Sequence, residues 1–403
     1  MAFAFRSQPL KTLYLVYVVL SVPFIRFPYW VAVSLLPSWR PRREWSLARA
    51  VSVRLLRTIL HVTFDTDLSP KPHTPEQNSK IADQLGFVWI EPVPDDLVVG
   101  KVREAAKVND VKPVRISGYW FGKRNSEGGF GHKAAPNERI IYALHGGGYI
   151  AASAEPASPH TNIVNHVLAH SGGLVERIFA LEYRLSSSAP FTPANPFPAA
   201  LLDAVAGYRY LVHDLGFKPG NIVIEGDSVG AHLALNLVMY LVEAQLPDLS
   251  LPRGLILLSP AADWSDSHHA DPASSMVRHR TVDYIDIFWS TGYTGRSLCG
   301  SLPSSELRTN AYISPASLAI EEPAGLFRGF PPTCVCVGDA ELLLDVSRTI
   351  RERLVTAIGP QNVTHHEYQD TVHDWLFMPL DAHGRKSLED IQDWVVNLWR
   401  EDL

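Results

Sequence analysis

The amino-acid sequence predicts an α/β fold, with a mainly parallel central sheet flanked by helices. Short apolar runs recur between turn signals, at residues 114–121, 140–144, 178–181, 222–224, 255–258 and 334–337. Runs of this length are typical of buried strands. Helical patterns lie between them, and the clearest places apolar side chains three or four residues apart from 201 to 215. Alternation of this kind indicates a parallel sheet covered on both faces.

The composition agrees with a large folded core. Of the 403 residues, 46% are apolar and 19% are charged, which excludes disordered and collagen-like chains. The formal charge of −6 provides no basic field for a phosphate backbone, so nucleic acid is not an expected partner. The three cysteines Cys299, Cys334 and Cys336 cannot form a disulfide framework and are interpreted as core residues.

Residues 1–60 are predicted to form a hydrophobic, membrane-associated extension. Two apolar runs, 12–25 and 27–39, flank Arg26, and each is shorter than the roughly 20 residues that span a bilayer. Three prolines are expected to break a continuous helix: Pro23, Pro28 and Pro37. We expect a retained anchor or a hairpin partly in the bilayer, with Tyr29, Trp30 and Trp39 at the headgroup level. Apolar helices packed on the catalytic domain are the alternative.

Charge gives the expected orientation of this extension. Six arginines lie between residues 40 and 57, whereas only Arg6 and Lys11 precede the apolar part. This bias predicts a cytosolic catalytic domain, with a lumenal orientation as the alternative. Residues 61–112 are predicted to be a linker and cap-contributing segment, because its first part is polar and carries Pro70, Pro72 and Pro75. The catalytic domain is then 113–403, with a lid insertion at about 263–325.

A Gly-x-Ser-x-Gly motif follows the predicted strand 222–224. The residues Gly226-Asp227-Ser228-Val229-Gly230 stand between this strand and an apolar helical pattern. A sharp strand-to-helix turn of this kind presents a serine hydroxyl above the sheet. Ser228 is therefore the candidate nucleophile.

Three glycines follow the predicted strand 140–144, in the sequence His145-Gly146-Gly147-Gly148. Consecutive glycines free the backbone to point N–H groups into a cavity, where they stabilise a developing oxyanion. The expected donors of the oxyanion hole are the amides of Gly146, Gly147 and Val229.

A serine hydroxyl needs a base, and that base is usually oriented by a carboxylate. His373 is the candidate base because it lies on a predicted loop after the last strand. The acid should follow the strand 334–337, where Asp339 and Glu341 compete. The resulting order of serine, acid and histidine is the order in α/β-hydrolases.

The chain resembles the hormone-sensitive-lipase family of α/β-hydrolases over roughly residues 138 to 385. The resemblance is carried by His145-Gly146-Gly147-Gly148, the Gly-Asp-Ser-x-Gly elbow, Glu182-Tyr183-Arg184-Leu185, Phe197-Pro198-Ala199-Ala200 with Asp203, and His373-Asp374. It implies the α/β-hydrolase fold with a helical lid, and it places Glu341 at the position of the family's acid. We therefore prefer Glu341 to Asp339. Val229 departs from the family, which usually has alanine there.

The expected function is that of a serine carboxylester hydrolase with an acyl-enzyme intermediate. The substrate would be a hydrophobic ester of a short or medium acyl or acetyl group, on a lipid, sterol or secondary metabolite. No nucleotide fingerprint or metal-ligand set is visible, so no cofactor is implied. The alternatives are an acyltransferase or cyclase that uses the same acyl-enzyme, and a non-catalytic ligand-binding protein on the same scaffold.

Overall fold

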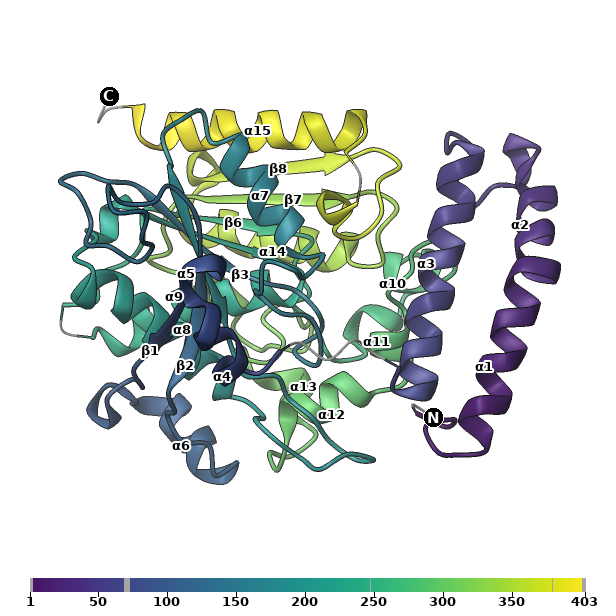
Figure 1. The fold of residues 1–403 in the computed structure, drawn as a ribbon, viewed down its shortest axis with the longest axis horizontal. Helices are drawn as coiled ribbons and strands as arrows, with labels where there is room; N and C mark the ends of the chain where they lie inside the picture. The colour runs from purple at the N-terminus through teal and green to yellow at the C-terminus, as the bar shows by residue number, and fades with distance from the viewer. Residues whose placement is uncertain (1–2, 69–72, 247, 379, 401–403) are drawn as a thin grey trace.

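The computed structural model describes residues 3–68, 73–246, 248–378 and 380–400, and it is built on one eight-stranded sheet (Figure 1). The strands are β1 (Phe87–Ile90), β2 (Ile116–Gly122), β3 (Ile140–Leu144), β4 (Arg177–Glu182), β5 (Ile222–Asp227), β6 (Gly254–Leu258), β7 (Thr333–Gly338) and β8 (Val363–Tyr368). Their order is β1-β2-β4-β3-β5-β6-β7-β8, and β3 to β8 pair in parallel while β1 and β2 pair antiparallel. The predicted mainly parallel sheet is confirmed.

Helices cover both faces of the sheet because successive strand side chains point to opposite sides. Ile140, Tyr142 and Leu144 of β3 join one core cluster, and Ile141 and Ala143 join the other. The first cluster includes side chains of α6 (Gly100–Val108), α8 (Ala199–Arg209), α9 (Val229–Ala244) and α14 (Leu344–Ile358). The second includes side chains of α7 (Thr161–Ala169) and α15 (Ala382–Leu398). The helix expected over 201–215 is α8, followed by the π-helical turn η5 (Tyr210–Asp214).

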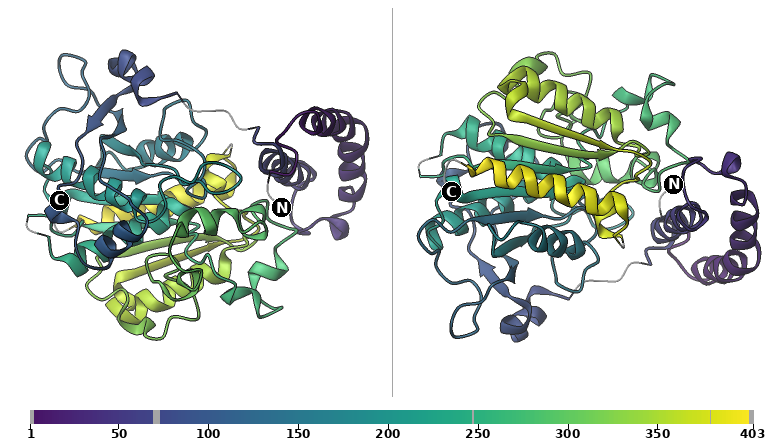
Figure 2. Two further views of the ribbon diagram at one scale, coloured as in Figure 1. Left: turned by 90° about the horizontal axis from the view of Figure 1, so that it is seen from below. Right: turned by 90° about the horizontal axis from the view of Figure 1, so that it is seen from above.

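The connection between β6 and β7 consists of short helices in place of another α/β unit. They are η7 (Ser267–His269), α10 (Ser275–Arg278), α11 (Ile287–Ser290), α12 (Tyr293–Cys299), α13 (Glu306–Thr309) and η8 (Pro323–Gly325). Helices α10 and α11 lie between the sheet and the N-terminal helices (Figures 1 and 2). This is the segment in which the sequence predicted a lid.

The segment predicted as a linker has secondary structure of its own. Helix α3 (Leu47–Thr66) extends into it, and α4 (Pro75–Asn78), η3 (Ser79–Ile81), α5 (Ala82–Leu85), β1 and η4 (Asp95–Leu97) follow before α6. Pro75 starts α4, whereas Pro70 and Pro72 lie outside the described residues.

The N-terminal apolar runs form one continuous helix, so the expectation that Pro23 and Pro28 would break it is wrong. Helix α1 (Leu10–Ser21) continues through the π-helical turn η1 (Val22–Arg26) into α2 (Phe27–Ser34). The N–H of Phe27 donates to the carbonyl of Val22, five residues earlier. This wider turn accommodates the two prolines, because it relaxes the four-residue ladder that proline disrupts. The 25-residue helix is long and apolar enough to cross a membrane by length and composition.

Helix α3 lies between this helix and the catalytic body (Figures 1 and 2). The chain turns after α2 through η2 (Pro37–Trp39) and returns along α2 as α3. At the other end, the Tyr14 hydroxyl of α1 donates to Asp65 Oδ2 of α3 over 2.7 Å. The two helices therefore form a hairpin that stands beside the sheet and its lid.

Candidate active site

Ser228 lies on a strained turn between β5 and α9. Its backbone has φ of +54° and ψ of −115°, and its N–H donates to the carbonyl of Leu258 over 2.8 Å. A Cβ at position 230 would lie 1.8 Å from the Leu144 oxygen, and one at position 226 would lie 2.3 Å from the backbone of Gly230. Only glycine fits at both positions, so the motif permits the sharp turn that presents the serine to the cavity described below.

Glu341 is the carboxylate that contacts the imidazole of His373. Its Oε2 lies 3.2 Å from His373 Nδ1, and both side chains are buried. The other carboxylate oxygen, Oε1, accepts from the Ser259 hydroxyl and from the Gly338 N–H, each over 2.7 Å. These bonds fix the carboxylate, so it can hold the ring in one orientation.

Asp339, the competing acid, lies elsewhere in the loop. Its Oδ1 accepts from the Asp370 N–H over 2.6 Å and lies 3.4 Å from the guanidinium of Arg42. Arg42 also donates to the carbonyl of Asp339, and the Trp45 indole donates to the carbonyl of Asp370 over 2.7 Å. In the described part of the chain Asp339 makes no contact with His373. The residue instead connects the N-terminal segment to the loops after β7 and β8.

Ser228 and His373 line the same cavity, which has a volume of about 200 Å³. Their side chains make no hydrogen bond with each other among the described residues. Catalytic hydrogen bonds are often long in free enzymes and shorten when substrate is bound. The arrangement therefore brings the two candidates from distant parts of the chain to one site.

Asp374 contacts His373, and its sequence position alone predicted no role for it. Its Oδ2 lies 3.0 Å from His373 Nε2, the atom that would have to accept the proton of Ser228. Asp374 has a left-handed backbone with φ of +45°, which turns its side chain back toward the preceding ring. The adjacent His-Asp pair was visible in the sequence, but this contact depends on the backbone turn.

The two carboxylates change the basicity of the imidazole. Burial disfavours a charged ring, but Asp374 and Glu341 outweigh burial and hold the pKa of His373 well above its ordinary value. Burial also raises the pKa of Asp374, to about 6. A raised pKa keeps the imidazole protonated up to a higher pH, and a protonated ring cannot take the serine proton.

Asp374→Asn is therefore expected to shift the acidic limb of the kcat/KM profile to lower pH. The substitution removes the negative charge beside Nε2, so the pKa of His373 falls and the free base is present at a lower pH. The measurement is kcat/KM for a soluble short-chain ester across the acidic range, with Asp370→Asn as the matched control on the same loop. An unchanged limb in Asp374→Asn would show that Asp374 does not control the base.

One predicted donor of the oxyanion hole, the Gly146 amide, has another partner in the structure. The Gly146 N–H donates to Asp227 Oδ2 over 3.0 Å, so this amide is already occupied and the expectation for it does not hold. Gly147 and Gly148 line the cavity with Ser228, and both have positive φ, at +104° and +66°. Among the described residues, the N–H groups of Gly147, Gly148 and Val229 donate to no protein acceptor. These three amides are the available donors.

Aromatic side chains from the lid form the walls of the cavity, including Trp264, Tyr284, Phe288 and Trp289. The Trp264 and Trp289 rings stack with centroids 4.8 Å apart, and the Trp289 indole donates to the carbonyl of Asp263 over 2.8 Å.

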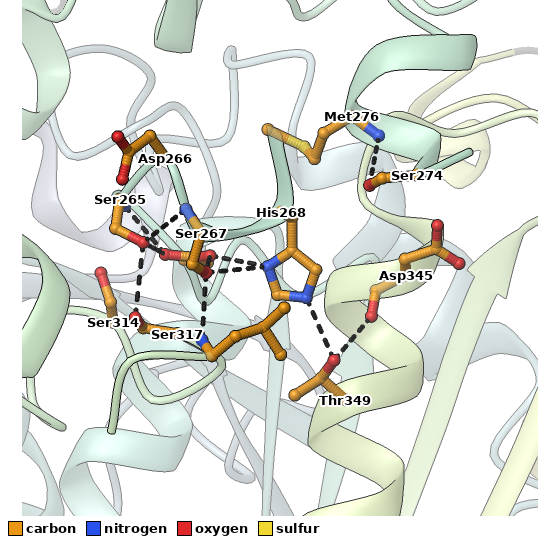
Figure 3. Close-up of polar contacts among 12 residues, drawn as sticks. Ser265, Asp266, Ser267, His268, Ser274, Met276, Ser314, Ser317, Asp345 and Thr349 are labelled. Carbon is orange, nitrogen blue, oxygen red and sulfur yellow. Dashed lines mark hydrogen bonds and ion pairs between the residues drawn. The ribbon is translucent and has the colours of Figure 1, made fainter. Parts of the chain in front are cut away.

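A buried polar network holds this part of the lid (Figure 3). The Asp263 carboxylate accepts from the hydroxyls of Ser265 and Ser267, each over 2.6 Å, and lies 2.7 Å from His268 Nδ1. The other nitrogen of His268 lies 3.1 Å from the Thr349 hydroxyl on α14. The network thus connects the backbone around Trp264, to which the Trp289 indole is also bonded, to a helix of the main domain.

Helix α3 forms the remaining wall, through Leu56, Ile59, Leu60 and Thr63. It is held to the lid by Arg57, whose guanidinium lies 2.9 Å from Asp286 Oδ2, and by His61, whose Nε2 lies 3.1 Å from Asp286 Oδ1. Side chains of α3 therefore close one side of the cavity that contains Ser228.

Comparisons with known proteins agree with this architecture. The family model described as the alpha/beta hydrolase fold matches residues 141–377. An acetyl-hydrolase of Streptomyces hygroscopicus is 31% identical over 257 residues, which cover 64% of this chain and 75% of that protein. Esterase LipU of Mycobacterium tuberculosis is 26% identical over 262 residues, which cover 64% of this chain and 77% of that protein.

A crystal structure of an esterase from the bacterial hormone-sensitive lipase family has the same fold. It superposes with a TM-score of 0.55 at 22% identity, covering 86% of this chain and 96% of that one. The family match spans more than half of the sequence and contains the elbow, the glycine loop, Glu341 and His373. The chain therefore belongs to the α/β hydrolase fold family, as its resemblance to hormone-sensitive lipases predicted, and is a carboxylester hydrolase.

Proposed function

We propose that the enzyme hydrolyses a short acyl ester of a hydrophobic alcohol, with Ser228 as nucleophile, His373 as base and Glu341 as the orienting acid. The observation that carries the proposal is that Ser228 and His373 share one cavity while Glu341 lies 3.2 Å from the ring. The available amides of Gly147, Gly148 and Val229 beside Ser228 support an oxyanion hole in the same cavity.

The reaction would take place in two steps. Ser228 Oγ attacks the ester carbonyl carbon while His373 Nε2, released from Asp374, takes the hydroxyl proton. The tetrahedral oxyanion accepts hydrogen bonds from the three amides, and its collapse expels the alcohol, which leaves with the proton from His373. Water, deprotonated by the same imidazole, then attacks the acyl-enzyme. The carboxylic acid is released, and His373 returns the proton to Ser228 Oγ.

The small volume and the aromatic walls of the cavity favour a short acyl group. About 200 Å³ is below the usual range for a pocket that encloses a drug-sized ligand. An acetyl group fits such a space with room for part of an apolar alcohol, such as a lipid, a sterol or a secondary metabolite. The similarity to an acetyl-hydrolase supports the same assignment.

Chain-length preference tests this proposal. We expect kcat/KM for p-nitrophenyl esters to be highest for acetate or butyrate and to fall by about 5- to 150-fold at octanoate, since overfilling a packed site costs roughly 1–3 kcal/mol. Leu60→Ala, which removes part of the α3 wall, should raise the octanoate-to-acetate ratio. Leu55→Ala on the same helix is the control, because Leu55 does not line the cavity. A flat profile, or equal effects of both variants, would contradict a short acyl pocket.

We also propose that the N-terminal hairpin lies in the plane of a membrane surface. Large apolar side chains of the helix formed by α1, η1 and α2 are strongly exposed, among them Leu13, Val19 and Phe24, the last at 75%. Because α3, the inner helix of the hairpin, packs on the catalytic body, an outer helix perpendicular to the bilayer would draw the polar surface of that body into hydrocarbon. In the in-plane arrangement the cavity is one helix away from the lipid, and the arginines at 40–57 favour the cytosolic leaflet.

A further inference from the structure

A second cavity, of about 490 Å³, lies where the end of α2 meets α3 and the loop after α10. Three arginines line it: Arg40 after η2, and Arg54 and Arg57 on α3. Two tryptophans, Trp30 on α2 and Trp39 in η2, line the same space. We call this space the basic pocket. None of its lining residues lines the catalytic cavity, although Arg57 also contacts Asp286 in the lid. The proposed reaction makes no use of the basic pocket.

The positive charge of the basic pocket is largely uncompensated. Arg57 is paired with Asp286, which His61 also contacts. Arg40 donates to the carbonyls of Ser34, Leu35 and Trp45, which carry no net charge.

Arg54 is the arginine of the pocket that is left for a ligand. Within the described residues its guanidinium has no hydrogen-bond or ion-pair partner, although it is only partly exposed. Among the described residues only one of the three guanidinium groups, that of Arg57, has a carboxylate partner, so the pocket carries an excess of positive charge that an anion would neutralise.

The surrounding sequence concentrates charge in the same place. Residues 1–64 contain nine basic residues and a single acidic one, although the whole chain has a net charge of −6. The basic residues directly follow an exposed apolar helix, and tryptophan prefers the headgroup layer of a bilayer. An in-plane apolar helix places its polar edge at the depth of the lipid phosphates.

We propose that the basic pocket binds the phosphate headgroup of an anionic bilayer lipid. The fork of an arginine guanidinium matches two phosphate oxygens, and the two tryptophans that line the pocket are of the residue type that prefers the headgroup layer. We assign the phosphate to a lipid and not to a dissolved ion, because the strongly exposed Trp39 lines the pocket and the exposed Leu35 and Leu36 lie just before it in the chain. This inference rests on the membrane association proposed above and is independent of ester hydrolysis.

Vesicle binding by the full-length protein tests the proposal, with phosphatidylcholine vesicles and vesicles containing one third phosphatidylserine. We expect tighter binding to the anionic vesicles, and about fivefold weaker binding to them for Arg54→Gln, with unchanged binding to neutral vesicles. Arg54→Lys should retain most of the gain. Arg115→Gln is the matched control, because Arg115 pairs with Glu91 next to the β1–β2 edge, away from the hairpin. The Arg54 guanidinium has no hydrogen-bond or ion-pair partner among the described residues, so replacing this side chain should leave the thermal unfolding temperature unchanged.

Three results would overturn the proposal. Equal binding of the wild type to both kinds of vesicle would show that the pocket selects no anion. An equal loss in Arg115→Gln would show that overall charge, and not the pocket, causes the preference. Submillimolar binding of inorganic phosphate that is lost in Arg54→Gln would assign the site to a soluble phosphate. If the protein did not bind neutral vesicles, the proposed membrane association itself would be refuted. None of these results would bear on the proposed esterase activity, which is measured separately.

Discussion

Replacing Ser228 with alanine is expected to lower kcat/KM for a soluble acetate ester by at least about 10⁴-fold. The nucleophile and its base act as a unit, so removing either member of such a triad leaves only the contribution of binding and the oxyanion hole. Steady-state hydrolysis of p-nitrophenyl acetate by purified Ser228→Ala and wild-type enzyme measures the effect.

The same variant should stay folded. Ser228 is buried, its backbone bond to Leu258 does not involve the side chain, and alanine occupies less space. An unchanged thermal unfolding temperature is therefore the control. A variant that keeps wild-type turnover would show that the hydrolysis starts from another residue.

The second large effect separates the two candidate acids. Glu341→Gln should reduce kcat by about 10³–10⁴-fold, because an amide at this position no longer stabilises the imidazolium and can hold the ring in the wrong tautomer. Asp339→Asn should change kcat by less than about threefold, because Asp339 pairs with Arg42 and not with His373. Its half-exposed ion pair contributes about 0–1 kcal/mol to stability, so the fold should be preserved.

The comparison of these two variants is decisive because both remove one carboxylate from the same loop. If Asp339→Asn lost activity and Glu341→Gln retained it, the acid would be Asp339, and the ring would have to turn on substrate binding. Rescue by Glu341→Asp to an intermediate rate would support a role of Glu341 in orienting the ring, since the shorter side chain keeps the charge but not the reach.

Much of the catalytic architecture could be predicted from the sequence because its signals are local. The six predicted strands are short apolar runs between turns, and burial on both faces of a parallel sheet makes them continuous in the sequence. The elbow at Ser228 and the glycine loop need glycine, because a Cβ would clash there or the backbone has a positive φ. Few backbone conformations have this requirement, so the two motifs are specific signals.

The features that could not be predicted depend on tertiary contacts. The Gly146 amide is not available as an oxyanion donor, because its N–H donates to the carboxylate of Asp227, from another strand, over 3.0 Å. Asp374 reaches His373 only because its backbone is left-handed. Pro23 and Pro28 lie within a continuous helix because a π-helical turn accommodates them. No residue pattern around the prolines predicts that turn.

Helix α3 also makes tertiary contacts that could not be predicted from its sequence. Its residues up to 60 were predicted to belong to a membrane anchor or, as the alternative, to apolar helices packed on the catalytic domain. In the structure one face contributes Leu56, Ile59 and Leu60 to the catalytic cavity, and another packs on α2. One segment can therefore serve both membrane attachment and the shape of the substrate site, which links the two proposals physically.

The most direct measurement of the central claim is covalent labelling with a fluorophosphonate, followed by mass spectrometry of the digested protein. An activated serine beside a histidine base reacts with such a probe, whereas ordinary serines do not. We predict one label per chain, on Ser228, with labelling slowed strongly in Glu341→Gln and His373→Ala but not in Asp339→Asn. A label on another residue, or no label on an enzyme that hydrolyses esters, would contradict the assignment of Ser228, His373 and Glu341.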